Sequence, residues 1–356
     1  MAWSSVDEFS QAVVPSWPTQ DLACGGDEFR EIITTYLGLP APCLASHVIR
    51  RTIIHGPNGR VEVDAYGQAV ATLALPGDGW RIQHNEVAEV VLDTVLRSGI
   101  RGEREPRGLF TGILPPEVRQ NGFSAHGIVP DGILNDLRFP PRQRGTRRLG
   151  AQYLVDFKIV HFGAANYRTQ PPRRALGKRR HAVTERARTV ASDYAAHARR
   201  LDEEHFDISA GAVRMGTVPQ GPVLTRLMTY PDTVGLVFGA YGEASDSVHR
   251  LLDEAVASAA RDWAAMGARS EAEARSFLST RYHRLWGITA ARAAARLRLS
   301  RMRYIGLSRE EVERLRSAPR PPAAGGSAED RWHRADVHVF EEQHGAGAPR
   351  LGGLGD

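Results

Sequence analysis

The chain has 356 residues, of which 42% are hydrophobic, and it carries a formal net charge of +5. This length and composition are enough for at least one sizeable core. No run approaches the roughly 18 consecutive apolar residues of a membrane span, and the N-terminus lacks the basic and apolar regions of a signal peptide. We therefore expect a soluble, intracellular protein with no membrane partner. With only Cys24 and Cys43, the sequence argues against a disulfide framework and against a close-spaced zinc pair.

A β-hairpin and a helix are the first elements that the pattern predicts. Residues 48–54 and 61–66 are short β-like runs separated by a Gly-Pro-Asn-Gly turn. Residues 84–99 carry an apolar face at helical spacing and end at Gly99, which predicts a helix.

Three strands are expected next. Residues 108–114 and 127–139 predict the first two, and the prolines and glycine that follow break the chain. Residues 151–162 then form a β-rich run that should be the hairpin partner of the second strand.

Helices dominate the remainder of the chain. We expect a long helix over residues 181–204, a buried strand over 233–240 and a helix over 247–266. Residues 271–315 read as wholly helical and basic, and the Pro-, Gly- and Ala-rich tail after about residue 317 is expected to be disordered. The order helix, three strands, helix, strand predicts a mixed α/β fold.

The third predicted strand carries two opposite charges. Its period of two puts Asp156 and Lys158 on one face and Val155 and Phe157 on the other. Burying charges is costly unless they are paired or coordinate a metal. The pair is therefore either a structural ion pair at a sheet edge or part of a reactive site.

A second carboxylate is expected to join this pair. If the second and third strands pair, Asp131 lies beside Asp156, and converging carboxylate oxygens are the ligands that Mg²⁺ requires. Lys158 would then orient the attacking water or stabilise charge on a phosphate. Of 46 basic residues only Lys158 and Lys178 are lysine. Because lysine is compact and its pKa shifts on burial, its retention here favours chemistry over a plain ion pair.

These residues resemble the motifs of the PD-(D/E)XK nuclease superfamily, over roughly residues 80–245. Pro130-Asp131 matches the first acidic motif, and Asp156-Phe157-Lys158 matches the second. The resemblance implies a restriction-endonuclease-like core that hydrolyses DNA phosphodiester bonds with Mg²⁺ or Mn²⁺. It also implies a further metal ligand from the first helix.

Two residues of that helix are candidates for the further ligand. His84 lies in line with the apolar face at its N-terminal end and is the first choice, and Glu86 is the second. A capping or packed histidine is the alternative interpretation of His84.

A looser similarity links the chain to nuclease-like domains of protist and algal retroelement proteins. The segments that carry it are residues 81–86, 108–110, 127–131 and 235–243. It implies a protein encoded by a mobile element, with a nuclear location as one option.

Basic residues supply the expected contacts to a nucleic acid, most simply DNA. In RecB-like relatives the helix after the second motif carries polar and tyrosine residues near the site, so Arg186 and Tyr194 are candidates. An amphipathic surface helix explains them equally well. His161 and Tyr167 are further candidates to line the cleft. Phosphate contacts are expected from Arg173, Arg174, Lys178, Arg179 and Arg180. A later helix extends this footprint with Arg292, Arg296, Arg298, Arg301 and Arg303.

The predicted organisation has four parts. They are an N-terminal extension with the hairpin (1–78), the nuclease-like core (79–266), a basic helical region (267–316) and the tail (317–356). Two other interpretations stay open. One is a catalytically inactive nuclease fold that only binds nucleic acid, and the other is an unrelated α/β protein with a plain ion pair. A homodimer is an open alternative to a single chain, because paired cuts in a duplex favour two copies.

Overall fold

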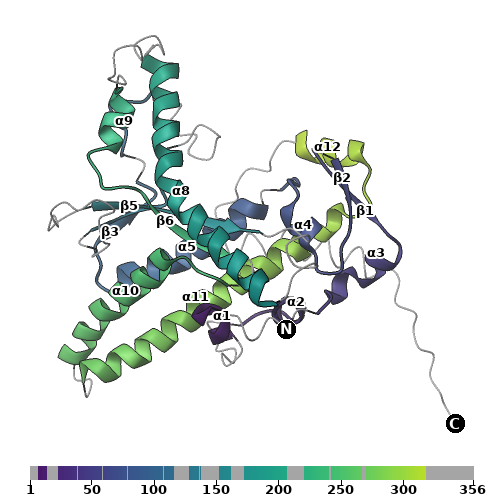
Figure 1. Cartoon of the computed structure of the whole chain (residues 1–356), viewed down its shortest axis with the longest axis horizontal. Coiled ribbons are helices and arrows are strands. Elements are labelled where there is room, and N and C mark those ends of the chain that lie inside the picture. Colours follow the sequence, from purple (N-terminus) through teal and green to yellow (C-terminus); the bar gives the residue numbers. More distant parts are fainter. Residues whose placement is uncertain are drawn as a thin grey trace.

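A computed structural model describes residues 7–13, 23–37, 39–57, 59–77, 79–106, 108–115, 128–135, 137, 152–161, 172–206, 220–239, 242–266 and 270–317, with only the backbone at 10 and 172–180. Within these ranges the chain is a mixed α/β protein with a four-stranded and a two-stranded sheet (Figure 1). The predicted α/β class is confirmed.

The larger sheet has the strand order β3-β4-β5-β6. Its strands are β3 (Gly102–Arg104), β4 (Gly132–Asn135), β5 (Gln152–Val160) and β6 (Val234–Gly239). The first three run antiparallel to their neighbours, whereas β5 and β6 are parallel. A parallel pair needs a long crossover connection, which here contains helices α8 (Pro172–Phe206) and α9 (Pro222–Leu227).

Helices cover both faces of this sheet. Helix α8 packs on the face that includes Leu154 and Val237, and the opposite face, with Val155 and Phe157, forms the largest core cluster. That cluster is completed by α5 (Gly79–Arg97), α10 (Asp246–Ala265), α11 (Glu271–Arg301) and α1 (Glu8–Val13).

A smaller core joins the N-terminal region to the short helix that follows α11 and contains Leu44, Ile54 and Tyr304. Its hairpin is β1 (Ile53–Gly56) with β2 (Gly59–Glu62). The remaining elements are α2 (Gly26–Leu37), η3 (Pro42–Leu44), α3 (Ala45–Ile49), α4 (Gln68–Thr72), η5 (Met302–Tyr304) and α12 (Arg309–Ser317).

The arginines of α11 tie these two regions together. Arg301 is 2% exposed, and its Nη1 donates to the carbonyl oxygens of Val70, Ala71 and Leu73 at 2.9–3.1 Å. Arg298 is 7% exposed and pairs with Glu31 at 3.3 Å. The expectation that these two arginines extend a nucleic-acid footprint is therefore wrong, because neither guanidinium is at the surface.

Several predicted elements need correction. Residues 108–114 form turns rather than a strand, and Leu109 and Phe110 are buried against the core that contains α9. The first strand of the larger sheet is instead β3.

The hairpin predicted from residues 48–54 and 61–66 is confirmed as β1 with β2, but residues 48–49 belong to α3.

The helix predictions are confirmed with different limits. Helix α5 begins at Gly79, and α8 begins at Pro172. The helical region 271–315 is interrupted by η5. The turn at residues 140–145, Tyr167 and the tail after Ser317 lie outside the described residues.

Among the described helices, none is individually long and apolar enough to cross a membrane. One bent pair, Gly26–Leu37 with Pro42–Ile49, meets that test by length and composition only.

Helix α8 lies close to β6 at Gly235, which pairs with Asp156 of β5. A Cβ atom there would lie 2.8 Å from the carbonyl oxygen of Ala187 and 2.8 Å from Cγ2 of Val190. Glycine is required at this position because the helix backbone occupies the space of a side chain.

We predict that Gly235→Ala lowers the free energy of unfolding by about 1–3 kcal/mol, because α8 must move away from the sheet. Gly108→Ala is the matched control, since a Cβ atom there meets nothing within 4 Å. Urea unfolding of both variants measures the difference. Equal midpoints for the two variants would show that the contact between α8 and β6 is not tight.

Candidate active site

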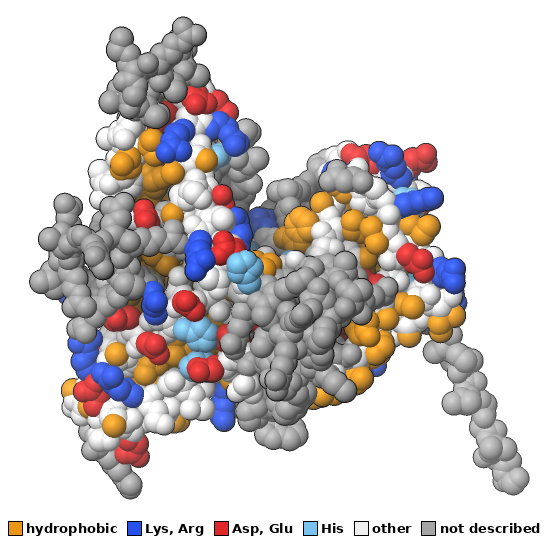
Figure 2. Space-filling view, in the orientation of Figure 1, with side chains coloured by type: hydrophobic (Ala, Val, Ile, Leu, Met, Phe, Trp, Pro, Cys, Tyr) orange, Lys and Arg blue, Asp and Glu red, His pale blue; other side chains and the backbone are white. Residues whose placement is uncertain are grey.

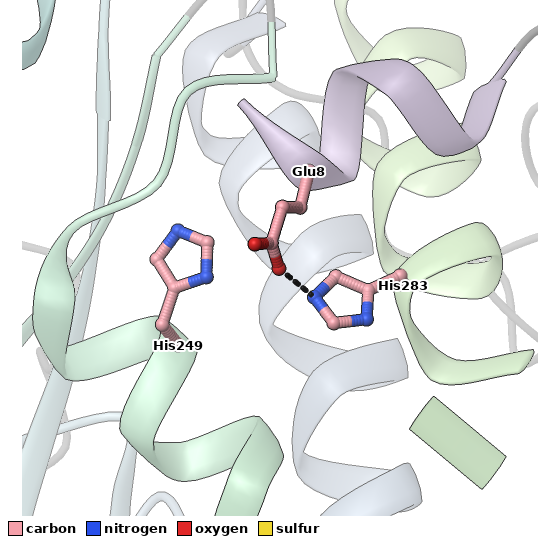
Figure 3. Close-up of side chains that lie close together, drawn as sticks. All are labelled: Glu8, His249 and His283. Carbon is pink, nitrogen blue, oxygen red and sulfur yellow. Dashed lines mark ion pairs between the residues drawn. The ribbon is translucent and has the colours of Figure 1, made fainter. Parts of the chain in front are cut away.

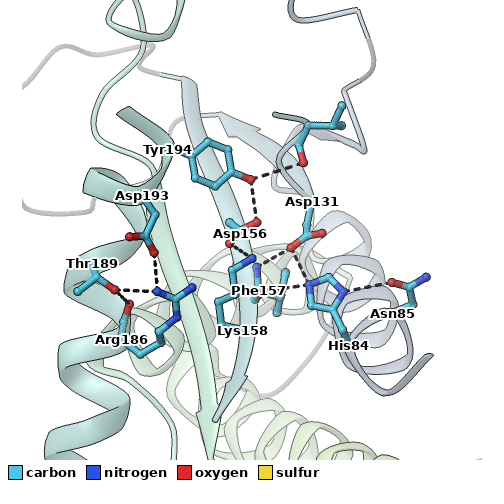
Figure 4. Close-up of polar contacts among 11 residues, drawn as sticks. His84, Asn85, Asp131, Asp156, Phe157, Lys158, Arg186, Thr189, Asp193 and Tyr194 are labelled. Carbon is cyan, nitrogen blue, oxygen red and sulfur yellow. Dashed lines mark hydrogen bonds and ion pairs between the residues drawn. The ribbon is translucent and has the colours of Figure 1, made fainter. Parts of the chain in front are cut away.

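The candidate site forms next to the first residue of β4, where β5 continues beyond its neighbour. Gly132, the first residue of β4, pairs with Val155, so β4 does not extend alongside Phe157. Side chains satisfy the Phe157 backbone instead. Its N–H donates to Oδ2 of Asp131 at 2.5 Å, and its carbonyl oxygen accepts from Nε2 of His84 at 2.9 Å (Figure 4).

His84 reaches this point from α5 and bonds through both ring nitrogens. Nε2 also lies 3.1 Å from Oδ2 of Asp131, and Nδ1 lies 3.1 Å from Oδ1 of Asn85. Burial lowers the pKa of His84, but the hydrogen bond and charge of Asp131 and the hydrogen bond to Asn85 outweigh it. The net effect raises the pKa to about 9. The imidazole is therefore protonated at neutral pH, and its surroundings favour positive charge.

Asp156 lies in the middle of β5, with its side chain 5% exposed. Its Oδ2 is 2.5 Å from Nζ of Lys158, and its Oδ1 accepts a hydrogen bond from the Tyr194 hydroxyl at 2.8 Å. Burial and then the nearby charge of Asp131 raise the pKa of Asp156, while Lys158 and Tyr194 oppose that rise. Burial also raises the pKa of Tyr194 well above its ordinary value, so its hydroxyl stays a donor.

The structure brings together five residues selected from the sequence: His84, Asp131, Asp156, Lys158 and Tyr194. Two further contributors were not foreseen, the Asn85 side chain and the Phe157 backbone. The register of β4 and β5 explains the second, because a strand that extends beyond its neighbour leaves backbone groups for side chains to bond.

Glu86, the second choice for a helix ligand, does not join this cluster. Its Oε1 pairs with Nε of Arg292 at 3.1 Å and Nη1 of Arg296 at 2.9 Å, and Arg296 also bonds Glu28 at 2.8 Å. Two residues along a helix correspond to a rotation of about 200°. Glu86 therefore faces α11 while His84 faces β5.

The predicted nucleic-acid contacts separate into three groups. Tyr194 belongs to the cluster, whereas Arg186 is a surface residue of α8 whose Nη1 pairs with Asp193 at 2.5 Å. On the face seen in Figure 2, basic and acidic side chains of the described residues are mixed. The side chains of Arg173, Arg174, Lys178, Arg179 and Arg180 lie outside the described set, although their backbone is part of α8.

The three predicted metal ligands do not surround one point, because Asp131 and His84 bond each other while Asp156 has other partners. Asp131 is directed to His84 and Phe157, and Asp156 is directed to Lys158 and Tyr194. Among the described residues, the three-ligand group whose ligand atoms lie within 4.8 Å of one another is found elsewhere. The donor types nevertheless fit a hard divalent cation, since two carboxylates, a backbone carbonyl and an imidazole suit Mg²⁺ or Mn²⁺.

Comparison with models of protein families, with curated proteins and with solved structures found no match for this chain.

His161, the first residue after β5, lies against α5 rather than in the cluster. Its Nε2 donates to Oε1 of Gln83 at 2.9 Å. Burial, and then the charges of Arg301 and Arg298, lower the pKa of His161 from 6.5 to about 4. The folded protein therefore holds this imidazole neutral.

Because the pKa of His161 is lower in the folded chain, the free energy of unfolding decreases as the pH falls. The unfolded chain binds a proton at His161 more readily than the folded chain does, so the stabilisation is full above pH 6.5 and is lost as pH falls through 4. We predict that His161→Gln removes up to about 3 kcal/mol of the acid-induced loss between those values. Urea unfolding at a series of pH values measures it, with the exposed His205→Gln as control. Parallel pH profiles for wild type and His161→Gln would contradict the assignment.

Proposed function

We propose that the chain is a metal-dependent nuclease of the PD-(D/E)XK type that hydrolyses DNA phosphodiester bonds. The observation that supports this most directly is the meeting of Asp131, Asp156 and Lys158 beside the edge of β5, with His84 arriving from α5. Two carboxylates and an ammonium group are the groups that phosphodiester hydrolysis with a divalent ion needs.

The order of elements is consistent with this proposal. Between residues 79 and 239 the chain runs through α5, β3, β4, β5, α8, α9 and β6. A restriction-endonuclease-like core has a helix, three strands, a helix and a strand in that order. The proposed site lies at the centre of this arrangement, on the strand that the parallel β6 and the antiparallel β4 flank.

Each side chain has a role that its contacts suggest. Asp131 and Asp156 would hold Mg²⁺ or Mn²⁺, together with His84 once its imidazole has released its proton to solvent, and the ion would polarise the phosphate and lower the pKa of a water. Lys158 presents an ammonium group beside Asp156, where it orients the attacking water or balances charge on the phosphate. Tyr194 fixes the orientation of Asp156 through its hydroxyl, and Asn85 fixes the ring of His84.

Charge balance explains how the same residues serve with and without an ion. The two carboxylates are compensated by the imidazolium of His84 and the ammonium of Lys158. A divalent ion between the carboxylates would compete with both partners for them. Lys158, whose side chain is 34% exposed, would then be free to face a substrate phosphate.

DNA is the substrate we propose, with contacts from the basic N-terminal part of α8 and from Arg186. The resemblance to retroelement proteins suggests nicking or cutting during the integration of a mobile element.

Cleavage assays on single variants test the proposal. We predict that Asp131→Asn, Asp156→Asn and Lys158→Ala each reduce Mg²⁺- or Mn²⁺-dependent DNA cleavage by at least about 100-fold, because each removes a ligand or a stabilising charge. Asp253→Asn, at an exposed position on α10, is the matched control and should keep wild-type activity. Thermal unfolding of every variant shows that each one is folded.

Two outcomes would overturn the proposal. Equal cleavage by all variants would assign the activity to a contaminating nuclease. DNA binding without metal-dependent cleavage by the wild type would instead identify a nuclease fold that only binds nucleic acid.

A second experiment tests the preference for lysine. We predict that Lys158→Arg loses at least about 10-fold in cleavage although the charge is kept, because a planar guanidinium is broader than a compact ammonium group. Single-turnover rates measure it. Full activity of the arginine variant would mean that position 158 supplies positive charge alone.

A further inference from the structure

A second cluster of ligand-type side chains lies on the other side of the sheet, where α1, α10 and α11 meet (Figure 3). It consists of Glu8 on α1, His249 on α10 and His283 on α11. One ligand atom from each lies within 4.8 Å of the other two, and Oε2 of Glu8 is 3.2 Å from Nε2 of His283. Figure 2 shows histidine side chains next to acidic ones on this face of the molecule.

In each histidine, the ring nitrogen that faces away from Glu8 donates a hydrogen bond that orients the ring. Nδ1 of His283 donates to the carbonyl oxygen of Ser279 at 2.8 Å, and Nε2 of His249 donates to Oδ2 of Asp7 at 3.0 Å. The remaining nitrogens, Nδ1 of His249 and Nε2 of His283, are directed toward Glu8. A histidine that ligates a metal is typically held in this manner, because the outer hydrogen bond fixes both the tautomer and the ring.

The core beneath the cluster holds these residues in place. Phe9, next to Glu8, is 0% exposed and packs against the rings of both His249 and His283, with centroids 4.9 and 4.7 Å away. A Cβ atom on Gly287 would lie 2.2 Å from the carbonyl oxygen of Phe9, so the backbone of α1 is pressed against α11. The position of Glu8 is thus set by packing rather than by its own exposed side chain.

We propose that Glu8, His249 and His283 form a site for a divalent transition metal of the Zn²⁺ class, separate from the candidate active site. Two imidazole nitrogens and one carboxylate oxygen are a ligand set that suits Zn²⁺ and is too nitrogen-rich for Mg²⁺. Three protein ligands leave a fourth position for water. A bound ion joins the N-terminal helix to α10 and α11 and stabilises the folded chain by binding it selectively.

Zinc titration of the full chain tests the site. The protein is stripped of metal with a chelator and titrated with Zn²⁺ by calorimetry, with Mg²⁺ in large excess so that the carboxylates of Asp131 and Asp156 are occupied. We expect one Zn²⁺ per chain and a rise in the unfolding temperature. Glu8→Gln, His249→Gln and His283→Gln should each weaken the zinc affinity by at least about 10-fold.

The choice of variants keeps this test independent of folding and of nuclease activity. The Glu8 side chain is 73% exposed, so Glu8→Gln does not disturb the core, and the exposed His205→Gln should bind zinc like the wild type. Co²⁺ provides a second readout, because a nitrogen-containing four-coordinate site absorbs visible light more strongly than an aqueous ion. Failure of the wild type to bind Zn²⁺, or equal affinity in wild type and Glu8→Gln, would overturn the proposal.

Discussion

The start of β4 at Gly132, two residues short of Phe157 on the neighbouring strand, is the constraint on which the candidate site depends. Because β4 begins at Gly132, the N–H and carbonyl groups of Phe157 need other partners, and Asp131 and His84 provide them. An unsatisfied backbone group in such a buried place costs about 1–3 kcal/mol. The side chains that satisfy the Phe157 backbone therefore also bring a carboxylate and an imidazole next to Asp156. The site is in this sense a consequence of the strand pairing.

The sequence predicted that Asp131, Asp156 and Lys158 lie together, because local rules govern their placement. A period of two separates Asp156 and Lys158 from Val155 and Phe157, and the structure confirms that division. The distinction between His84 and Glu86 was harder, since it depends on what lies beside α5. Glu86 faces Arg292 and Arg296, which are more than 200 residues away in the chain, and no local pattern reveals that neighbour.

The basic C-terminal helix shows why composition alone misleads. An arginine-rich stretch is usually a solvated face, yet Arg298 and Arg301 are buried because their partners arrive from the N-terminal region. Arg301 bonds three backbone carbonyl oxygens around α4, and Arg298 bonds Glu31. A guanidinium has five donors, so it can satisfy carbonyl groups at the end of a short helix. The prediction of a strand over residues 108–114 failed for another reason. Apolar residues of this segment are buried, but burial does not require a strand.

A plain ion pair between Asp156 and Lys158 accounts for less of the structure than a reactive site does. Such a pair needs two residues, whereas here side chains from α5, the start of β4, β5 and α8 converge on one place. Burial, and then the nearby charge of Asp131, raise the pKa of Asp156, so repulsion between the two carboxylates offsets part of what the bond from the Phe157 N–H to Asp131 contributes. A cation held by both carboxylates would turn the same proximity into affinity. We therefore propose a bound cation, in addition to the strand pairing, as the explanation of this arrangement.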